Sequence, residues 1–146
     1  MQGMSFEQFY AGFGFKYFTA AEILTKGTSH VDPDDPGFGL NTDPPPELWW
    51  NIIATVRALE WLRADIDEPI SLLSGYRSPA YNKAIGGAAV SQHMNFTALD
   101  FYAKSKSPGF CFNRLKYFRS QGGFTGGLGL YSWGVHVDTR GVNKDW

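Results

Sequence analysis

The sequence predicts an α+β domain in which a small antiparallel sheet packs against helices. Three observations predict it. Helical and strand-like segments are mixed along the 146 residues without the regular alternation of a parallel βαβ fold. Seventeen glycines and eight prolines indicate many turns, which is not typical of a plain helical bundle. The length fits one compact domain, which we expect to span residues 1–146.

The first half of the chain predicts two helices separated by a loop. Thr19 and Glu22 match a capping box, which predicts a short helix as far as Lys26. Residues 28–47 hold five of the eight prolines, so we expect a proline-rich surface loop there. Pro46 is expected to begin the main helix. Its apolar face is a stripe at steps of three and four, widened by three tryptophans: Leu48, Ile52, Val56, Leu59 and Leu62, with Trp49, Trp50 and Trp61.

The second half alternates short strands and helices. Within the central strand the side chains alternate, so Asp100 shares a face with Ala98 and Tyr102. The expected strands cover residues 70–74, 97–102, 127–131 and 134–138, and the expected helices cover residues 79–85 and 110–120.

Charge and composition exclude several classes of protein. The formal charge of −1 provides no basic face for nucleic acid, and no stretch approaches the ~20 apolar residues of a membrane span. Cys111 is the one cysteine, which excludes an intrachain disulfide and a thiolate zinc site. The N-terminal residues lack the basic start and apolar run of a signal peptide, so we expect synthesis in the cytoplasm without one.

Three residues are candidates for a metal site. His93 precedes the central strand, Asp100 lies within it, and His136 lies in the last apolar strand. A carboxylate in an aromatic-rich strand is costly to bury unless it is paired or binds a metal. Two imidazoles and one carboxylate leave a fourth position for water and preserve the Lewis acidity of zinc. On spacing alone, a structural role for these residues is an open alternative.

A family resemblance favours the metal site. Ser91-x-His93-x-x-x-x-Ala98-x-Asp100 resembles the Ser-x-His-x-x-Gly-x-Ala-x-Asp motif of the zinc D-alanyl-D-alanine carboxypeptidases. That family includes phage L-alanyl-D-glutamate endolysins and shares a fold with the hedgehog signalling domain. Further stretches look like one branch of it, in family order: Phe18–Leu24, Ser74–Asn82, Gly86–His93, Gly127–Tyr131 and His136–Asp138.

The resemblance implies a hedgehog/DD-peptidase-like fold and a site for Zn2+. It implies that His93, Asp100 and His136 are the zinc ligands and that Arg77 binds a substrate carboxylate, which suits a planar guanidinium. Ser91 and Gln92 are candidates for hydrogen bonds to substrate or to the ligands, and for Ser91 a turn-capping role is an equal alternative.

The implied function is a monomeric zinc metallopeptidase, either a carboxypeptidase or an endopeptidase. Its substrates are the peptide stems of bacterial peptidoglycan, at bonds that contain D-amino acids. The expected setting is a phage or prophage endolysin that reaches the cell wall after release. The alternative is a catalytically inactive, zinc-containing module that binds peptidoglycan or forms part of a virion.

Two departures from the family pattern bear on activity. Phe96 replaces the motif glycine, and its ring is expected either to narrow the cleft or to reshape the turn at His93. Trp133 and Gly134 stand where many members carry an acidic residue or a second histidine. Asp138 is therefore the nearest candidate for the general base, with two alternatives: orienting His136, or pairing with Arg140.

Overall fold

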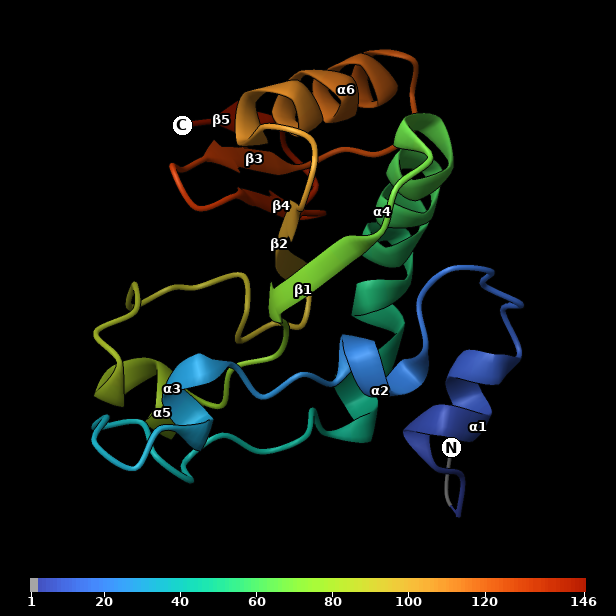
Figure 1. Ribbon diagram of the computed structural model, residues 1–146. Coiled ribbons are helices and arrows are strands. Elements are labelled where there is room, and N and C mark those ends of the chain that lie inside the picture. The colour runs from blue at the N-terminus through green and yellow to red at the C-terminus, as the bar shows by residue number, and fades with distance from the viewer. Residues whose placement is uncertain (1–2) are drawn as a thin grey trace.

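The computed structural model describes residues 3–146 and confirms the α+β class (Figure 1). Five strands form one sheet in the order β1-β2-β4-β3-β5. The first four strands pair antiparallel, as predicted, whereas β5 was not predicted and runs parallel to β3. The strands are β1 (Ile70–Ser74), β2 (Ala98–Ala103), β3 (Gly127–Leu130), β4 (Val135–Asp138) and β5 (Lys144–Asp145).

Helices surround this sheet unevenly. Figure 1 shows α6 lying along the β3–β5 end and α4 beside it, while α3 and α5 gather near the far end of β1. No helix within residues 3–146 is long and apolar enough to cross a membrane. The helices are α1 (Phe6–Ala11), α2 (Ala20–Ile23), α3 (Thr28–Val31), the 3-10 helix η1 (Pro46–Ile52), α4 (Ile53–Ile66), α5 (Pro79–Ala84) and α6 (Pro108–Ser120).

Apart from shifts of one or two residues at α5 and α6, the helices differ from the prediction in three places. The Thr19–Glu22 capping box forms, but its helix ends at Ile23 instead of reaching Lys26. Regular structure begins at Pro46 as expected, although its first seven residues form a 3-10 helix. The surface loop 28–47 is not wholly irregular, because α3 forms at its start.

Helix α1 was missed, although the sequence carries a signal for it. Ser5 and Gln8 form a reciprocal capping box at its N-terminus. Phe6, Phe9 and Tyr10 then bury their rings against the main core. The pattern Ser-x-x-Gln before an aromatic run is thus a usable start signal in this chain.

The core lies between one face of the sheet and the helices α4 and α6. Strands β2 and β4 each send two fully buried apolar side chains to that face. Most of the predicted apolar stripe, which runs through η1 and α4, is also fully buried, whereas Trp50 is 62% exposed and packs against Phe9 and Phe13. The residues at this interface include Leu99, Phe101, Val135 and Val137 from the sheet, and Ile52, Val56, Leu59, Leu62 and Leu115 from the helices.

Glu60 fastens the N-terminal segment to α4. Its carboxylate accepts hydrogen bonds from the backbone N–H groups of Lys16, Tyr17 and Phe18, at 2.7, 2.7 and 3.0 Å. Bonds from N–H groups to a charged acceptor are stronger than those to a neutral one. We therefore expect Glu60→Gln to lower the free energy of unfolding by about 2 kcal/mol, measured by urea denaturation.

The control for this prediction is Glu7→Gln, because Glu7 is exposed on α1. It should change the free energy of unfolding by less than about 0.5 kcal/mol. Equal losses in the two variants would mean that the Glu60 contacts contribute nothing specific.

Candidate metal centre and cleft

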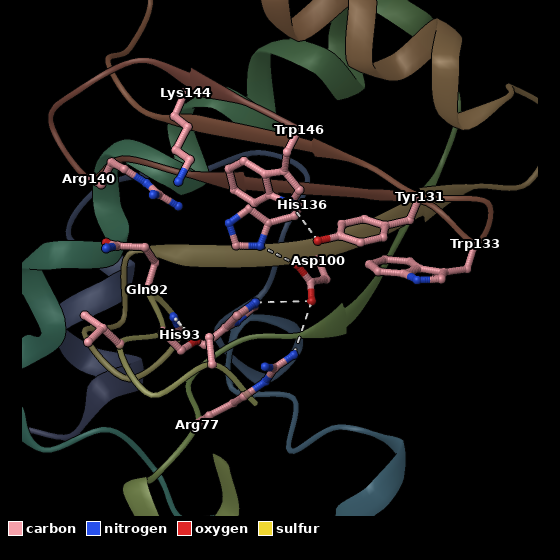
Figure 2. A pocket seen from close by; sticks show the side chains of 13 residues that line it. Arg77, Gln92, His93, Asp100, Tyr131, Trp133, His136, Arg140, Lys144 and Trp146 are labelled. Carbon is pink, nitrogen blue, oxygen red and sulfur yellow. Dashed lines mark hydrogen bonds and ion pairs between the residues drawn. The ribbon is translucent and has the colours of Figure 1, made fainter. Parts of the chain in front are cut away.

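Three buried donor groups meet on the face of the sheet opposite the core. The ligand atoms of His93, Asp100 and His136 all lie within 4.8 Å of one another. His93 Nε2 lies 3.1 Å from Asp100 Oδ2, and His136 Nδ1 lies 2.9 Å from Asp100 Oδ1 (Figure 2). Zinc–ligand bonds of about 2.0–2.2 Å in a tetrahedron place neighbouring donors about 3–3.5 Å apart. The two histidine–aspartate contacts match this spacing, and the three ligand atoms together lie close enough to hold a metal ion.

The strands place two of these residues and a turn places the third. Asp100 on β2 is directly opposite His136 on β4, so both side chains leave the same face of the sheet. His93 lies in the turn that leads into β2. Its carbonyl accepts the backbone N–H of Arg77 at 3.1 Å, which ties this turn to the segment after β1.

The two ring nitrogens of His93 differ in their hydrogen bonding within residues 3–146. Its Nδ1 lies 2.7 Å from the carbonyl oxygen of Gly75, which can only accept, so Nδ1 carries the proton. Within residues 3–146, the buried Nε2 has no hydrogen-bond partner. Burial lowers the pKa of His93 below its ordinary value, which favours the neutral ring. A neutral imidazole with an unused lone pair facing a carboxylate is the form that binds a metal ion.

His136 lies between two carboxylates. Its Nδ1 faces Asp100 and its Nε2 lies 2.8 Å from Asp138 Oδ2. Burial lowers the pKa of His136, but hydrogen bonds to both carboxylates outweigh it and raise the pKa above its ordinary value. A cation is therefore favoured between His136 Nδ1 and Asp100, and a metal ion can take the place of the proton.

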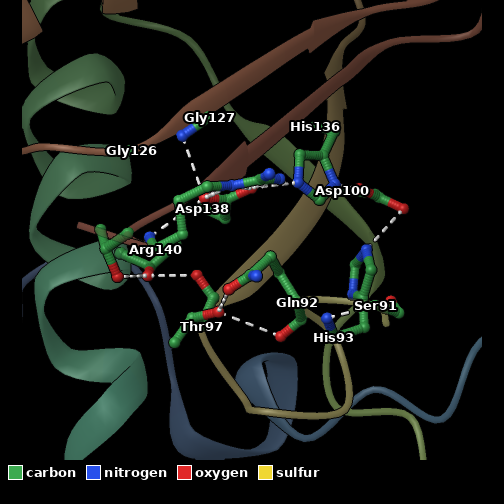
Figure 3. Close-up of polar contacts among 12 residues, drawn as sticks. Ser91, Gln92, His93, Thr97, Asp100, Gly126, Gly127, His136, Asp138 and Arg140 are labelled. Carbon is green, nitrogen blue, oxygen red and sulfur yellow. Dashed lines mark hydrogen bonds and ion pairs between the residues drawn. The ribbon is translucent and has the colours of Figure 1, made fainter. Parts of the chain in front are cut away.

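Asp138 lies at the Nε2 edge of the His136 ring and is fully buried (Figure 3). Its carboxylate accepts the backbone N–H of Gly127 at 2.9 Å and a guanidinium nitrogen of Arg140 at 2.7 Å. Burial raises the pKa of Asp138, but the contacts with His136 and Arg140 outweigh it and hold the pKa well below the usual range. Asp138 is therefore an ionised acceptor on the side of His136 that faces away from Asp100.

The three donor groups lie at the floor of a cleft with a volume of about 540 Å³. Its walls come from the turn before β2, the β3–β4 hairpin and the segment around β5. The lining residues are Arg77, Ala88, Val90, Ser91, Gln92, His93, Asp100, Tyr131, Trp133, His136, Arg140, Lys144 and Trp146.

Comparison with known proteins assigns the family. A sequence profile described as peptidase M15 matches residues 16–138, which is most of the chain and includes all three donor residues. The chain belongs to the M15 peptidase family. M15 peptidases are zinc enzymes that act on peptidoglycan, so this chain is a metallopeptidase of that class. No curated protein and no solved structure matches it.

The substrate-binding candidates of this M15 peptidase all line the cleft. Arg77 Nη2 lies 3.4 Å from Asp100 Oδ2, and its Nε donates to Ser74 Oγ at 3.2 Å. Ser91 Oγ accepts the backbone N–H of His93 at 3.2 Å, which is the turn-capping geometry. Gln92 accepts a hydrogen bond from the Thr97 hydroxyl through its Oε1 at 2.9 Å. Binding of substrate by these side chains is a proposal.

The cleft also contains residues to which the sequence analysis gave no role. Tyr131 and Trp133 stack with ring centroids 4.8 Å apart on the β3–β4 turn, and Lys144 and Trp146 come from the β5 segment. Tyr131 ends the Gly127–Tyr131 stretch that resembles the family, but the sequence predicts no function for it. The alternation of Lys144 and Trp146 around Asp145 was the one available signal, but three residues are too few to predict a strand from periodicity.

Sterics explain why this M15 peptidase lacks a second histidine two residues before His136. A Cβ atom at Gly134 would lie 2.2 Å from the backbone oxygen of Phe101, so no side chain fits there. Trp133, the other substituted position, is 45% exposed on the turn and lines the cleft.

Phe96 does not line the cleft, so the expectation that its ring narrows the cleft is wrong. The ring is fully buried in the core, with its centroid 5.9 Å from that of Phe6 and 6.0 Å from that of Tyr76. Its backbone has φ of 56°, the left-handed region that glycine adopts most easily. The left-handed backbone of this turn therefore accounts for the glycine in the family motif. The present chain adopts the same backbone conformation with a phenylalanine.

Restoring the glycine is expected to destabilise the protein. Phe96→Gly relieves left-handed strain of about 1 kcal/mol but leaves a cavity that costs about 3–5 kcal/mol. We expect a net loss of about 3 kcal/mol in the free energy of unfolding, measured by urea denaturation. Phe96→Leu, which keeps the strain but fills part of the cavity, should lose less. A glycine variant as stable as the parent would show that the strain outweighs the packing.

Proposed function

We propose that this chain is a zinc peptidase that hydrolyses peptide stems of bacterial peptidoglycan at bonds containing D-amino acids, within one domain spanning residues 1–146. One observation carries the proposal. Among the described residues 3–146 the buried Nε2 of His93 has no hydrogen-bond partner, and it lies with Asp100 and His136 in a group that could hold a metal ion at the floor of a cleft. Membership of the M15 family supports the same chemistry.

In this proposal His93, Asp100 and His136 hold the zinc ion. Zinc, when bound, polarises a scissile carbonyl and lowers the pKa of water. Arg77 anchors a carboxylate of the substrate near the cut, for which its guanidinium geometry is suited. Ser91 fixes the turn that carries His93, and Gln92 offers its side-chain NH2 to the substrate backbone, since its Oε1 already accepts from Thr97.

Asp138 acts in this proposal by positioning His136. It is fully buried, and its Oδ2 accepts the Nε2–H of the ring, which keeps the Nδ1 lone pair on the side of Asp100. Both oxygens of Asp138 are also used by Arg140. These contacts support an orienting role over direct proton transfer to or from the substrate.

The test is hydrolysis of purified murein by the zinc-loaded protein. We expect new amino groups to appear and a chelator to stop their release, with activity restored by added zinc. Mass analysis of the products separates the two modes of cutting, because a carboxypeptidase releases single D-amino acids and an endopeptidase releases larger fragments. No release from murein of several chemical types would contradict the proposal.

A binding module without catalysis is the second candidate, and one observation favours it. Among the cleft-lining residues within 3–146, Asp100 is the one carboxylate, so a dedicated base is not evident from the side chains. A module of this kind would bind stoichiometric zinc and sediment with murein, yet release no amino groups.

We also propose a phage or prophage endolysin as the setting, supported by the resemblance to phage endolysins. Lysis of cells with exposed walls by added protein tests it.

A further inference from the structure

The short strand β5 forms one wall of the metal cleft. Its side chains alternate, so Lys144 and Trp146 face the cleft while Asp145 faces α6. There Asp145 binds Arg119 at 2.6 Å and Lys116 at 3.3 Å. These ion pairs, with the backbone bonds of Trp146 to Leu128 and Leu130, hold the wall in place.

Glycines on β3 allow this wall to approach the metal ligands. A Cβ atom at Gly129 would lie 2.7 Å from the indole of Trp146, and one at Gly127 would lie 3.0 Å from it. With these side chains absent, the Trp146 ring lies across the strand with its centroid 5.1 Å from that of His136. Lys144 pairs with Gly127 in the same sheet, so its side chain leaves the wall beside the metal group.

The charges in the cleft are unbalanced. Arg77 lies on the His93 side of the donor group, and Lys144 and Arg140 lie beyond His136 (Figure 2). Arg140 is neutralised by Asp138, but the Lys144 ammonium makes no ion pair or hydrogen bond within residues 3–146. The chain as a whole has a formal charge of −1, so an excess of positive charge does not explain why these cations lie together in the cleft. Arg77 contacts Asp100 at 3.4 Å, so Lys144 is the one cleft cation without a counter-charge among the described residues, and such a cation attracts an anionic ligand.

We propose that Lys144 forms a second anion-binding subsite, so that the peptidase selects peptides with a carboxylate on each side of the scissile bond. Arg77 takes one carboxylate and Lys144 takes the other. The inference rests on the proposed function. Lys144 lies outside the residues matched by the family, 16–138, so this specificity comes from the segment after the last matched strand.

The experiment uses two synthetic stem peptides that differ in one group. The side carboxyl of their D-glutamyl residue is either a carboxylate or a carboxamide. We expect the zinc-loaded protein to cleave the carboxylate peptide with a kcat/KM about 5-fold higher than that for the carboxamide peptide. Lys144→Gln should remove this preference by lowering the kcat/KM for the carboxylate peptide and leaving that for the carboxamide peptide unchanged. The preference should weaken with added salt. Lys144→Arg should retain it, and Lys104→Gln, which removes an exposed cation outside the cleft, should leave it unchanged.

Binding of both peptides, measured by calorimetry, separates the two proposals. If the zinc-loaded protein cleaves neither peptide but binds the carboxylate peptide more tightly, and Lys144→Gln removes that binding preference, the peptidase function is contradicted and the subsite is retained. Cleavage of both peptides at equal kcat/KM, or an equal loss for both in Lys144→Gln, would overturn the subsite and retain the peptidase. No binding and no cleavage of either peptide would overturn both.

Discussion

Asp100→Asn is expected to remove stoichiometric zinc and to lower murein hydrolysis by about 10³-fold or more, because losing the metal forfeits several kcal/mol of transition-state stabilisation. The carboxylate is the one anionic member of the donor group and contacts both imidazoles, at 3.1 and 2.9 Å. An amide oxygen is a weaker ligand, and its NH2 group would point a donor at one of the histidines. Metal analysis and the rate of amino-group release measure the two effects.

The control for this variant is Asp43→Asn, since Asp43 is an exposed residue paired with Lys26 at 2.6 Å. It should keep both zinc and activity. Circular dichroism should show that Asp100→Asn remains folded, because the buried apolar core lies on the other face of the sheet. Full zinc occupancy in Asp100→Asn would show that the metal binds elsewhere, and the donor group would lose its assignment.

The metal group could be predicted from the sequence because two of its members lie on strands with clear alternation. Leu99 and Phe101 identify the buried face of β2, and that places Asp100 on the other face. Val135 and Val137 do the same for His136. Spacing does not reveal that the two strands are neighbours. The resemblance to known peptidases supplied that step, and the register of β2 and β4 is consistent with it.

The role of Asp138 could not be decided from the sequence, because alternation gives a shared face but not the direction of a side chain. Residues 136 and 138 of one strand are about 6.5–7 Å apart at Cα, a separation compatible with all three predicted roles. The 2.8 Å contact with His136 Nε2 and the complete burial of the carboxylate support the proposed orienting role.

The wall at β5 was also beyond sequence analysis. A strand of two residues has no measurable period, and its place next to β3 depends on contacts made at a distance along the chain. The sequence predicts that Gly127 and Gly129 lie on a strand, 127–131. Their functional meaning, the space left for Arg140 and Trp146, exists only in the folded protein.

Asp138→Asn is expected to lower both zinc affinity and murein hydrolysis by about 10- to 100-fold, the usual effect of losing a partner that orients a metal ligand. Both oxygens of Asp138 act as acceptors: Oδ1 for Gly127 and for the backbone of Arg140, Oδ2 for His136. An asparagine must turn its NH2 group toward one of these sets of donors. If the NH2 group faced Nε2 of His136, Nε2 would have to accept a hydrogen bond. The ring proton would then lie on Nδ1 and block the lone pair that binds the metal.

A matched control separates this effect from the loss of an arginine ion pair. Asp65 holds Arg114 through bonds of 2.7 and 2.9 Å, much as Asp138 holds Arg140, but it contacts no histidine. Asp65→Asn should leave zinc affinity, measured by chelator competition, unchanged. If Asp138→Asn kept its zinc affinity and lost cleavage at saturating zinc, the positioning role would be wrong and Asp138 would be the base. A parallel loss of affinity and rate, recovered in part by excess zinc, is the outcome that the contact with His136 predicts, because the carboxylate then acts through the ligand it orients.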